Sequence, residues 1–465
     1  MFDVQEQILL PRAGPVTIWI GVSLATTSAS IAHDAAQDIL TLLAKNRLTD
    51  IDVDFRGSIY TRAGGPALVP PASRADSPLV RFVRPLTPGL GLFISARDMP
   101  DVQGTMTLYL EEGGQGLNSR LLGVTSRHTI VCPKEPNTTV TAQSSAPPRD
   151  VVLLSDCRLD QVIQSIEVSL LSARRDVYHC EQNIKERSSA SNAAHAETKK
   201  ARAEKEILAL ETLLADINRD WMSIDQRVLG HLLHSPPIRL GVGKEQFTED
   251  WAVFEIDRTK LGPGFQGNAL DLGNMSEMTV MKKCRSGKGE DWEFDYPFDD
   301  ELFALRDFLP VHLMRQPDAH DQRTGEPSLL VIKSGSTTGT TFGRANGVFS
   351  LVREYSDTDV WQMSRQWAIM SFGDLGFLPL PDDESGAFAA LGDSGAIIAD
   401  TKGRIGGMLT GGSCKVNAPN SREEQELDLV YSTPFEWVLE RIKADAFPDA
   451  HLDIKIDVQG APSRA

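Results

Sequence analysis

The chain has 465 residues, a formal net charge of −17 at pH 7 and a pI near 5.0, and such an acidic surface excludes nucleic acid or an anionic membrane as a partner. The N-terminus is acidic and no apolar run approaches the ~20 residues that span a bilayer, so neither a secretory leader nor a membrane anchor is expected. Five scattered cysteines without zinc-type spacing predict no metal site and a cytoplasmic location, where thiols stay reduced. No other cofactor is expected.

A chain of this length exceeds one usual domain, so two or three structural units are expected. Residues 1–86 form the first, an N-terminal α+β unit with a linker, and a possible pro-domain. Periodicity predicts a strand over Val16–Val22, a helix over Ala32–Ala44 and a strand over Ile51–Arg56. The Gly- and Pro-rich stretch at 62–80 indicates the linker.

The next part of the chain is rich in short apolar runs that are typical of β-strands. Strands are predicted over 90–95, 105–110 and 120–128, and again from Asp250. The acidic and aromatic stretch at 284–300 is interpreted as a loop.

A helical insertion interrupts these strands at residues 158–228. Apolar residues recur at steps of four and three over Leu159–Ile184 and, after a polar break, over Ala203–Val228. Two such seams predict an antiparallel coiled-coil hairpin. Two interpretations stay open, a spacer that packs only on itself and an arm for docking or self-association.

Near the C-terminus a strand over Leu429–Ser432 leads into a helix. Thr433–Glu436 matches a capping box with proline at the first helical position, and an apolar face follows from Trp437 onward. Residues 446–465 are interpreted as a tail.

One short stretch, Gly392-Asp393-Ser394-Gly395, has the composition of a nucleophile turn. Gly392 permits the backbone to turn so that its N–H and that of Ser394 point into one pocket, where they could stabilise an oxyanion. Gly395 would leave room for a substrate carbonyl beside the serine hydroxyl. A base and an orienting carboxylate are needed as well.

His128, at the end of an apolar strand, and Asp250, at the start of another, are the candidates. An imidazole is the usual general base near neutral pH. Taken separately, His128 could be a surface histidine and Asp250 a strand-start cap. Together with Ser394 they give the order His, Asp, Ser that is found in one known triad arrangement.

Five stretches of the chain resemble sequence motifs of the chymotrypsin-like (trypsin-fold) serine endopeptidases, in particular bacterial and fungal ones. They are Val124–His128, Asp250–Phe254, Lys333–Thr340, Gly392–Gly395 and Gly406–Gly412. The likeness covers roughly residues 88–157 and 229–445.

The resemblance implies a mostly β fold of two six-stranded antiparallel β-barrels of the trypsin type. The first barrel takes residues 87–157 and 229–300, around the inserted hairpin at 158–228. The second takes residues 301–445 and ends with the C-terminal helix, before the tail at 446–465.

The resemblance also implies roles for single residues. His128 is the general base, Asp250 orients it, Ser394 is the nucleophile, and Gly392 and Ser394 supply the oxyanion N–H groups.

Substrate-binding positions are carried over in the same way. Phe388, six residues before the nucleophile, corresponds to the position that sets side-chain preference; Thr410, Gly411 and Gly412 belong to the strand that pairs with substrate. Secreted relatives begin with Ile-Val-Gly-Gly, whose freed amine holds the Asp before the nucleophile. No such start occurs near residue 88, so another donor is expected for Asp393.

The function expected is that of a serine endopeptidase, restricted to cytoplasmic processing or regulation, with a protein or peptide substrate. The alternative is an inactive protease-fold scaffold whose hairpin at 158–228 binds partners or a second copy.

Overall fold

The computed structural model divides the chain into two compact units, Met1–Ala63 and Gly64–Ala465. It describes residues 16–22, 28–57, 65–71, 79–113, 119–142, 147–185, 190–262, 264–273, 275, 277–284, 294–298, 301–320, 325–355, 361–371, 387–413, 426–427 and 429–454.

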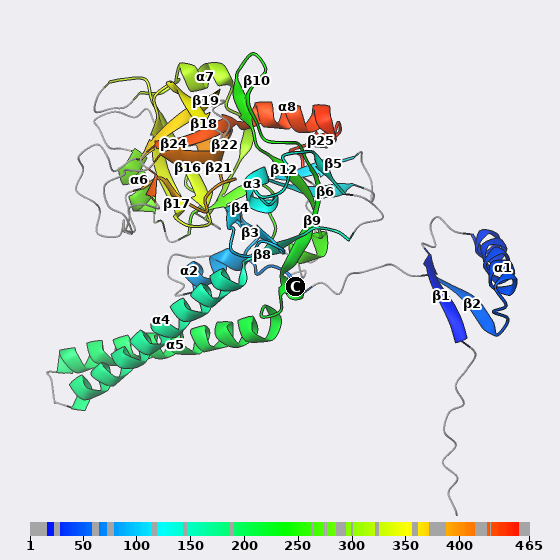
Figure 1. Cartoon of the computed structure of the whole chain (residues 1–465). Coiled ribbons are helices and arrows are strands. Elements are labelled where there is room, and N and C mark those ends of the chain that lie inside the picture. The colour runs from blue at the N-terminus through cyan, green and yellow to red at the C-terminus, as the bar shows by residue number, and fades with distance from the viewer. Residues whose placement is uncertain are drawn as a thin grey trace, which may run out of the picture. The chain divides into compact units, whose positions relative to one another are not determined.

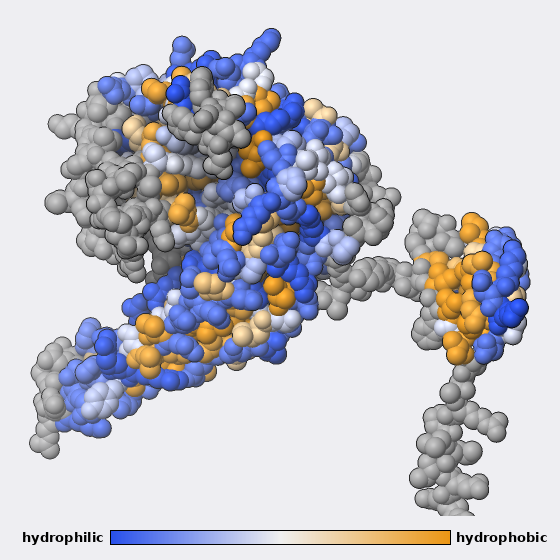
Figure 2. Space-filling view, in the orientation of Figure 1, coloured by the Kyte–Doolittle hydropathy of each residue, from blue (hydrophilic) through white to orange (hydrophobic). Residues whose placement is uncertain are grey.

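The N-terminal unit is a β-α-β element. Strands β1 (Val16–Val22) and β2 (Ile51–Gly57) pair in parallel and are joined by helix α1 (Ala29–Lys45), since parallel strands need a crossover connection. Ser28 caps α1 by accepting a hydrogen bond from the N–H of Ile31. Figure 2 shows apolar residues gathered on the sheet side of this unit and hydrophilic ones on the helix side. The three elements expected here are confirmed.

The larger unit is mostly β, and its first sheet is an open half-barrel (Figure 1). The strand order is β25-β5-β6-β12-β9-β8-β3-β4, with β7 beside β9. The bounds are β3 (Phe93–Ala96), β4 (Gly104–Thr105), β5 (Tyr109–Glu112), β6 (Arg120–Thr125), β7 (Val140–Thr141), β8 (Asp150–Leu153), β9 (Val228–Ser235), β12 (Ala252–Ile256) and β25 (Ala450–His451). The strands at the two ends of this order, β4 and β25, do not pair within the described residues, and a half-barrel beside a closed barrel is consistent with the two-barrel fold that was expected.

The second sheet contains a closed barrel of six antiparallel strands. Pairing runs β16-β17-β19-β24-β22-β21 and back to β16. The bounds are β16 (Leu329–Gly335), β17 (Gly339–Ala345), β19 (Trp361–Ser371), β21 (Ile397–Asp400), β22 (Arg404–Ser413) and β24 (Leu429–Pro434), with β15 (Arg306–Phe308) and β18 (Phe349–Tyr355) attached at its sides. Inward-facing side chains such as Trp367 and Met408 have no exposed surface.

Smaller elements connect these bodies, and one hydrophobic core runs through both. The bounds are α2 (Val80–Val83), η1 (Arg84–Leu86), α3 (Arg127–Ile130), η2 (Ile224–Arg227), β10 (Arg239–Val242), β11 (Phe247–Glu249), η3 (Arg258–Lys260), β13 (Ala269–Asp271), α6 (Glu277–Cys284), β14 (Leu302–Ala304), α7 (Val311–Arg315), β20 (Ala389–Ala390) and β23 (Glu426–Leu427). Of the stretch 284–300 that was expected to be a loop, Cys284 is the last residue of helix α6, and 285–293 lie outside the described residues.

Two long helices, α4 (Asp156–Lys185) and α5 (Ala190–Asp220), project from the half-barrel (Figure 1). They run antiparallel, as the ion pairs Arg174–Glu211 and Lys200–Glu181 show, both at 2.7 Å. Helix α5 ends at Asp220, earlier than the apolar seam predicted up to Val228. Ile224 lies in η2 and Val228 begins β9.

The C-terminal helix α8 (Phe435–Asp445) buries the predicted apolar face, including Trp437 and Ile442. The expected capping box is wrong. Pro434 is the N-cap residue, and the hydroxyl of Thr433 donates instead to the carbonyl of Thr248 on the neighbouring strand. Among the helices of the described ranges, none combines the length and apolarity needed to cross a bilayer.

Candidate functional site

His128 and Asp250 are brought into direct contact by strand pairing. β6 and β12 are antiparallel neighbours with Thr125 opposite Ala252, so the residues just after β6 meet those just before β12. The His128 Nδ1 lies 2.5 Å from Asp250 Oδ2, and the His128 backbone N–H donates to Asp250 Oδ1 at 3.2 Å. Because a carboxylate only accepts, the ring proton is on Nδ1, which leaves Nε2 as the basic nitrogen.

The environment of this pair keeps Asp250 ionised. Its side chain is 6% exposed and that of His128 is 32% exposed. Burial alone would raise the pKa of Asp250, but the charge and hydrogen bonds of His128 outweigh burial, and the pKa lies below its ordinary value. Asp250 can therefore orient the imidazole and stabilise it when it takes up a proton.

A buried arginine fixes the short helix that carries His128. Arg127 Nη1 donates to the carbonyls of Ser235 and Pro236 at 3.2 and 3.0 Å, and its Nη2 donates to Thr138 O at 2.9 Å. Its guanidinium thus ties α3 to the end of β9. The position of the imidazole is set by the sheet rather than by α3 alone, which is only one turn long.

Ser394 lies on a turn that is hydrogen-bonded to the half-barrel. The N–H of Thr105 donates to Ser394 O at 2.8 Å, and the hydroxyl of Thr125 donates to Thr105 O at 2.9 Å. The carbonyl of Leu409 accepts from both Gly395 N (2.8 Å) and Ser126 Oγ (3.4 Å). The nucleophile turn and the segment leading to His128 therefore share hydrogen-bonding partners at the junction of the two sheets.

Both glycines of the turn have positive φ angles, +99° at Gly392 and +91° at Gly395. L-residues rarely adopt this conformation. A Cβ at Gly392 would also collide with Thr337 Oγ1, and one at Gly395 with Thr105 O. The position of a Cβ on Gly395 is thus taken by a carbonyl of the protein itself, and the room for a substrate carbonyl beside Ser394 stays a prediction.

Two backbone N–H groups of the turn, those of Gly392 and Ser394, donate to no acceptor among the described residues, whereas the Asp393 N–H donates to Ala390 O. The orientation of each N–H is fixed by a hydrogen bond to the carbonyl of the same peptide unit, because the N–H and the carbonyl of a planar peptide point in opposite directions. Leu391 O accepts from Thr337 Oγ1 at 2.7 Å, and Asp393 O accepts from Ala396 N at 2.9 Å. Each N–H group is therefore held in place without an acceptor among the described residues, as an oxyanion donor must be.

Asp393 is held by Lys333, a residue that the sequence analysis did not identify. Both side chains are fully buried, with Nζ 3.0 Å from Asp393 Oδ2. The carboxylate also accepts from Thr337 N and Thr338 Oγ1, each at 2.7 Å, and from Ala390 N at 3.1 Å. The donor expected for Asp393 is therefore an internal lysine. A lysine inside the apolar run of β16 was the only signal for it in the sequence.

The predicted substrate-binding residues lie in different surroundings. Phe388 has no exposed surface, and Lys333 Nζ lies 5.8 Å from its ring centre. Thr410 and Gly411 are half-buried on β22. A Cβ added at Gly411 would meet no atom within 4 Å, whereas a Cβ added at Gly412 would lie 2.6 Å from Leu429 O. Gly411 thus faces open space, and the pocket roles of all four stay predictions.

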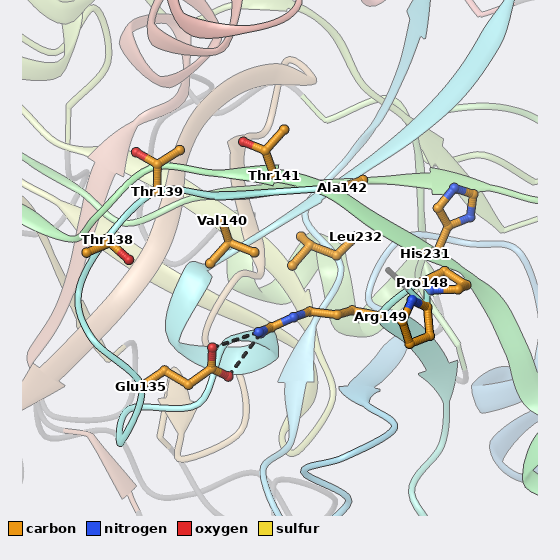
Figure 3. Close-up of a pocket in the computed structure, with 11 residues that line it drawn as sticks. Glu135, Thr138, Thr139, Val140, Thr141, Ala142, Pro148, Arg149, His231 and Leu232 are labelled. Carbon is orange, nitrogen blue, oxygen red and sulfur yellow. Dashed lines mark hydrogen bonds and ion pairs between the residues drawn. The ribbon is translucent and has the colours of Figure 1, made fainter. Parts of the chain in front are cut away.

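A separate cavity of about 650 Å³ lies between the 135–142 segment and β9 (Figure 3). Arg149 reaches across its floor to Glu135, with which it forms two hydrogen bonds of 2.9 and 2.8 Å. The Glu135 pKa is lowered by this pairing. None of the three candidate catalytic residues lines this cavity.

The fold and site define a mostly β protein whose half-barrel supplies a His–Asp pair and whose closed barrel supplies a serine turn with two oriented N–H donors. Comparison with protein-family models and with curated proteins finds no match for this chain. Within the described ranges no three His, Cys, Asp or Glu side chains are grouped to hold a metal ion.

Proposed function

We propose that the protein is a serine endopeptidase with a fold of the trypsin type. The observation that carries the proposal is the buried, ionised Asp250 on the Nδ1 of His128, at the junction where the Ser394 turn is bonded to the same sheet. A chain that used His128 only as a surface residue would have no need of this orientation.

In the proposed reaction His128 Nε2 removes the proton of Ser394 Oγ, which attacks the peptide carbonyl. The Gly392 and Ser394 N–H groups stabilise the oxyanion of the tetrahedral intermediate. The imidazolium then protonates the leaving amine and an acyl-enzyme remains. Water, deprotonated by His128, hydrolyses the acyl-enzyme and restores the serine.

We infer restricted processing in the cytoplasm rather than digestion. Cys132, Cys157 and Cys180 are free thiols, which fits a reducing compartment. A digestive enzyme would degrade an unfolded protein such as casein rapidly, whereas a restricted protease labels at its serine but leaves casein intact over hours.

Fluorophosphonate labelling of the full chain tests the function. Mass spectrometry is expected to find one adduct per chain, absent from Ser394→Ala and formed at least about a hundredfold more slowly by His128→Ala, because the general base contributes ~10²–10⁴. Ser413→Ala, at an exposed serine of β22, is the matched control and keeps the adduct. Labelling that does not depend on Ser394 would refute the proposal.

The second candidate is a scaffold that binds partners through the hairpin. Two paired helices bury only the seam between them, and four large apolar side chains on α4 and α5 are 58–67% exposed and open to a partner: Val168, Leu171, Tyr178 and Leu208. This candidate predicts no adduct, and partner binding that is unchanged in Ser394→Ala.

A further inference from the structure

A small cavity of about 260 Å³ lies between α2, the first turn of α4 and the turn that joins β16 to β17. Arg81, Arg84 and Arg158 all line it, beside the backbone of residues 335–339. Figure 1 shows α2 next to the end of α4 from which the hairpin emerges. The volume is below the ~300–1,000 Å³ of usual organic-ligand pockets, so the cavity suits a small ion or group.

The three guanidinium groups are held by neutral acceptors. The acceptors are Asp271 O, Ser334 Oγ and Thr340 Oγ1 for Arg84, Gln161 Oε1 and Ser336 O for Arg158, and Ser169 Oγ for Arg81. Stacking holds two of them further, with Arg81 4.5 Å from the ring centre of Phe82 and Arg158 4.5 Å from that of Phe93. No ion pair joins any of the three arginines to a carboxylate within the part of the chain that the structure describes.

The cavity therefore carries an excess of positive charge and spare donors. Its one lining carboxylate, Asp271, accepts from Gly273 N at 2.7 Å and offsets a single guanidinium. Asp393, whose charge also acts on Arg158, is paired with Lys333, so the cluster keeps a net positive charge in a chain whose net charge is −17. The Arg158 Nε is buried and has no hydrogen-bond partner, which is costly unless a ligand supplies an acceptor.

We propose that this cavity binds a phosphate-class oxyanion, either inorganic phosphate or the phosphoryl group of a small metabolite. Phosphate offers several acceptor oxygens and a charge near −2, which matches the charge and the planar donor sets of clustered arginines. A monovalent halide offers neither the charge nor the geometry.

The site is coupled to the nucleophile turn, an extension that rests on the proposed function. Arg158 Nη2 donates to Ser336 O at 3.1 Å, and Ser336 Oγ donates to Gly392 O at 2.6 Å. Burial lowers the pKa of Lys333, the charge of Asp393 and the hydrogen bond to it act in the opposite direction, and the charge of Arg84 adds to the lowering. An anion that offsets the arginines would favour charged Lys333 beside Asp393 and so order the turn that carries Ser394.

Isothermal titration of the full chain with inorganic phosphate, and separately with glycerol 3-phosphate, tests the site. We expect saturable binding of one anion per chain that chloride at equal ionic strength does not reproduce. Arg158→Gln is expected to weaken it about ten- to a hundredfold, since hydrogen bonds to charged groups contribute ~1.5–3 kcal/mol. Arg81→Gln, at the exposed rim, is the second variant, and Arg175→Gln, an exposed arginine of α4, is the control that binds as the wild type does.

The relative affinities identify the source of the anion: tighter phosphate binding indicates the free ion, and tighter ester binding a small metabolite. Absence of saturable binding, or binding that both Arg158→Gln and Arg81→Gln leave unchanged, would overturn the proposal. The coupling predicts that phosphate accelerates fluorophosphonate labelling of Ser394, and an unchanged rate would overturn the coupling alone. A chain that binds phosphate but never labels would remove the protease function and leave the site.

Discussion

Burying a lysine and an aspartate as a pair carries a cost in desolvation that an exposed pair does not. A buried charge whose partner has been removed destabilises the folded state still more. Lys333 and Asp393 meet this condition, because neither has exposed surface and the carboxylate takes further hydrogen bonds from the 337–338 backbone and hydroxyl groups. Asp393 directly precedes Ser394, so the pair fixes the peptide units whose N–H groups are the proposed oxyanion donors.

Replacing Lys333 by methionine should therefore both destabilise the fold and disable the turn. The lone buried carboxylate costs about 3–5 kcal/mol in the free energy of unfolding, and Ser394 labelling is expected to fall below detection. Urea denaturation and fluorophosphonate labelling measure the two effects. Lys402→Met is the control. The Lys402 side chain is 40% exposed and its Nζ lies 3.4 Å from Asp318 Oδ2, and such an exposed ion pair contributes at most about 1 kcal/mol to the free energy of unfolding.

A double variant, Lys333→Met with Asp393→Asn, distinguishes positioning from mere stability. Removing both charges should restore most of the lost stability while labelling stays low, because the neutral amide cannot hold the turn in the same way. Recovery of labelling together with stability would contradict the positioning role of the pair.

At this scale the sequence indicates the residues whose chemistry is local. His128, Asp250 and the Ser394 turn stand in short stretches of recognisable composition, and the structure places the first two in contact. Lys333 could not be predicted as the partner of Asp393, because its importance arises only when β16 lies beside the turn. The close approach of Thr105 O to Gly395 could not be predicted either, since Thr105 comes from the other sheet.

The hairpin is the element that depends least on distant pairing, and its helices lie close to where the apolar seams predicted them. Near the start of α4 the buried face differs from the predicted seam, which contained Ile163: Val162 is buried there and Ile163 is only partly buried. α4 packs there against α2 as well as α5, so a second face of the helix is covered. The apolar seams therefore predict the contact between α4 and α5 but not the contact of α4 with α2.

Leu210 should be a principal contributor to the stability of the hairpin. It is fully buried, and Leu210→Ala is expected to lower the free energy of unfolding by about 2–5 kcal/mol. Leu208→Ala removes the same atoms from the same helix at a side chain that is 67% exposed, and should change stability by less than about 0.5 kcal/mol. Urea denaturation followed by circular dichroism measures both; equal effects would mean that α5 does not use this face.

At the scale of the whole molecule, strand alternation predicts a β-rich body but not which strands close a barrel. Closure of the second sheet depends on the pairing of β16 with β21, a strand that follows much later in the chain than its other neighbour, β17. The first sheet is a half-barrel, because the strands at the two ends of its order, β4 and β25, do not pair within the described residues. Local patterns do not encode such long-range register.

The internal position of Lys333 leads to a prediction for the N-terminal unit. Since the Asp393 carboxylate is already paired with a buried lysine, no freed N-terminal amine is needed to order the oxyanion turn. Cleavage at a protease site inserted after Ala63, at the boundary of the two compact units, should leave the rate of Ser394 labelling within about twofold of that of the uncut chain, a difference of ~0.4 kcal/mol in the barrier. The matched control is the uninserted chain treated with the same protease. A large increase on cutting would mean that the turn is ordered by processing after all, and that the Lys333–Asp393 pair is a core ion pair without a role in the site.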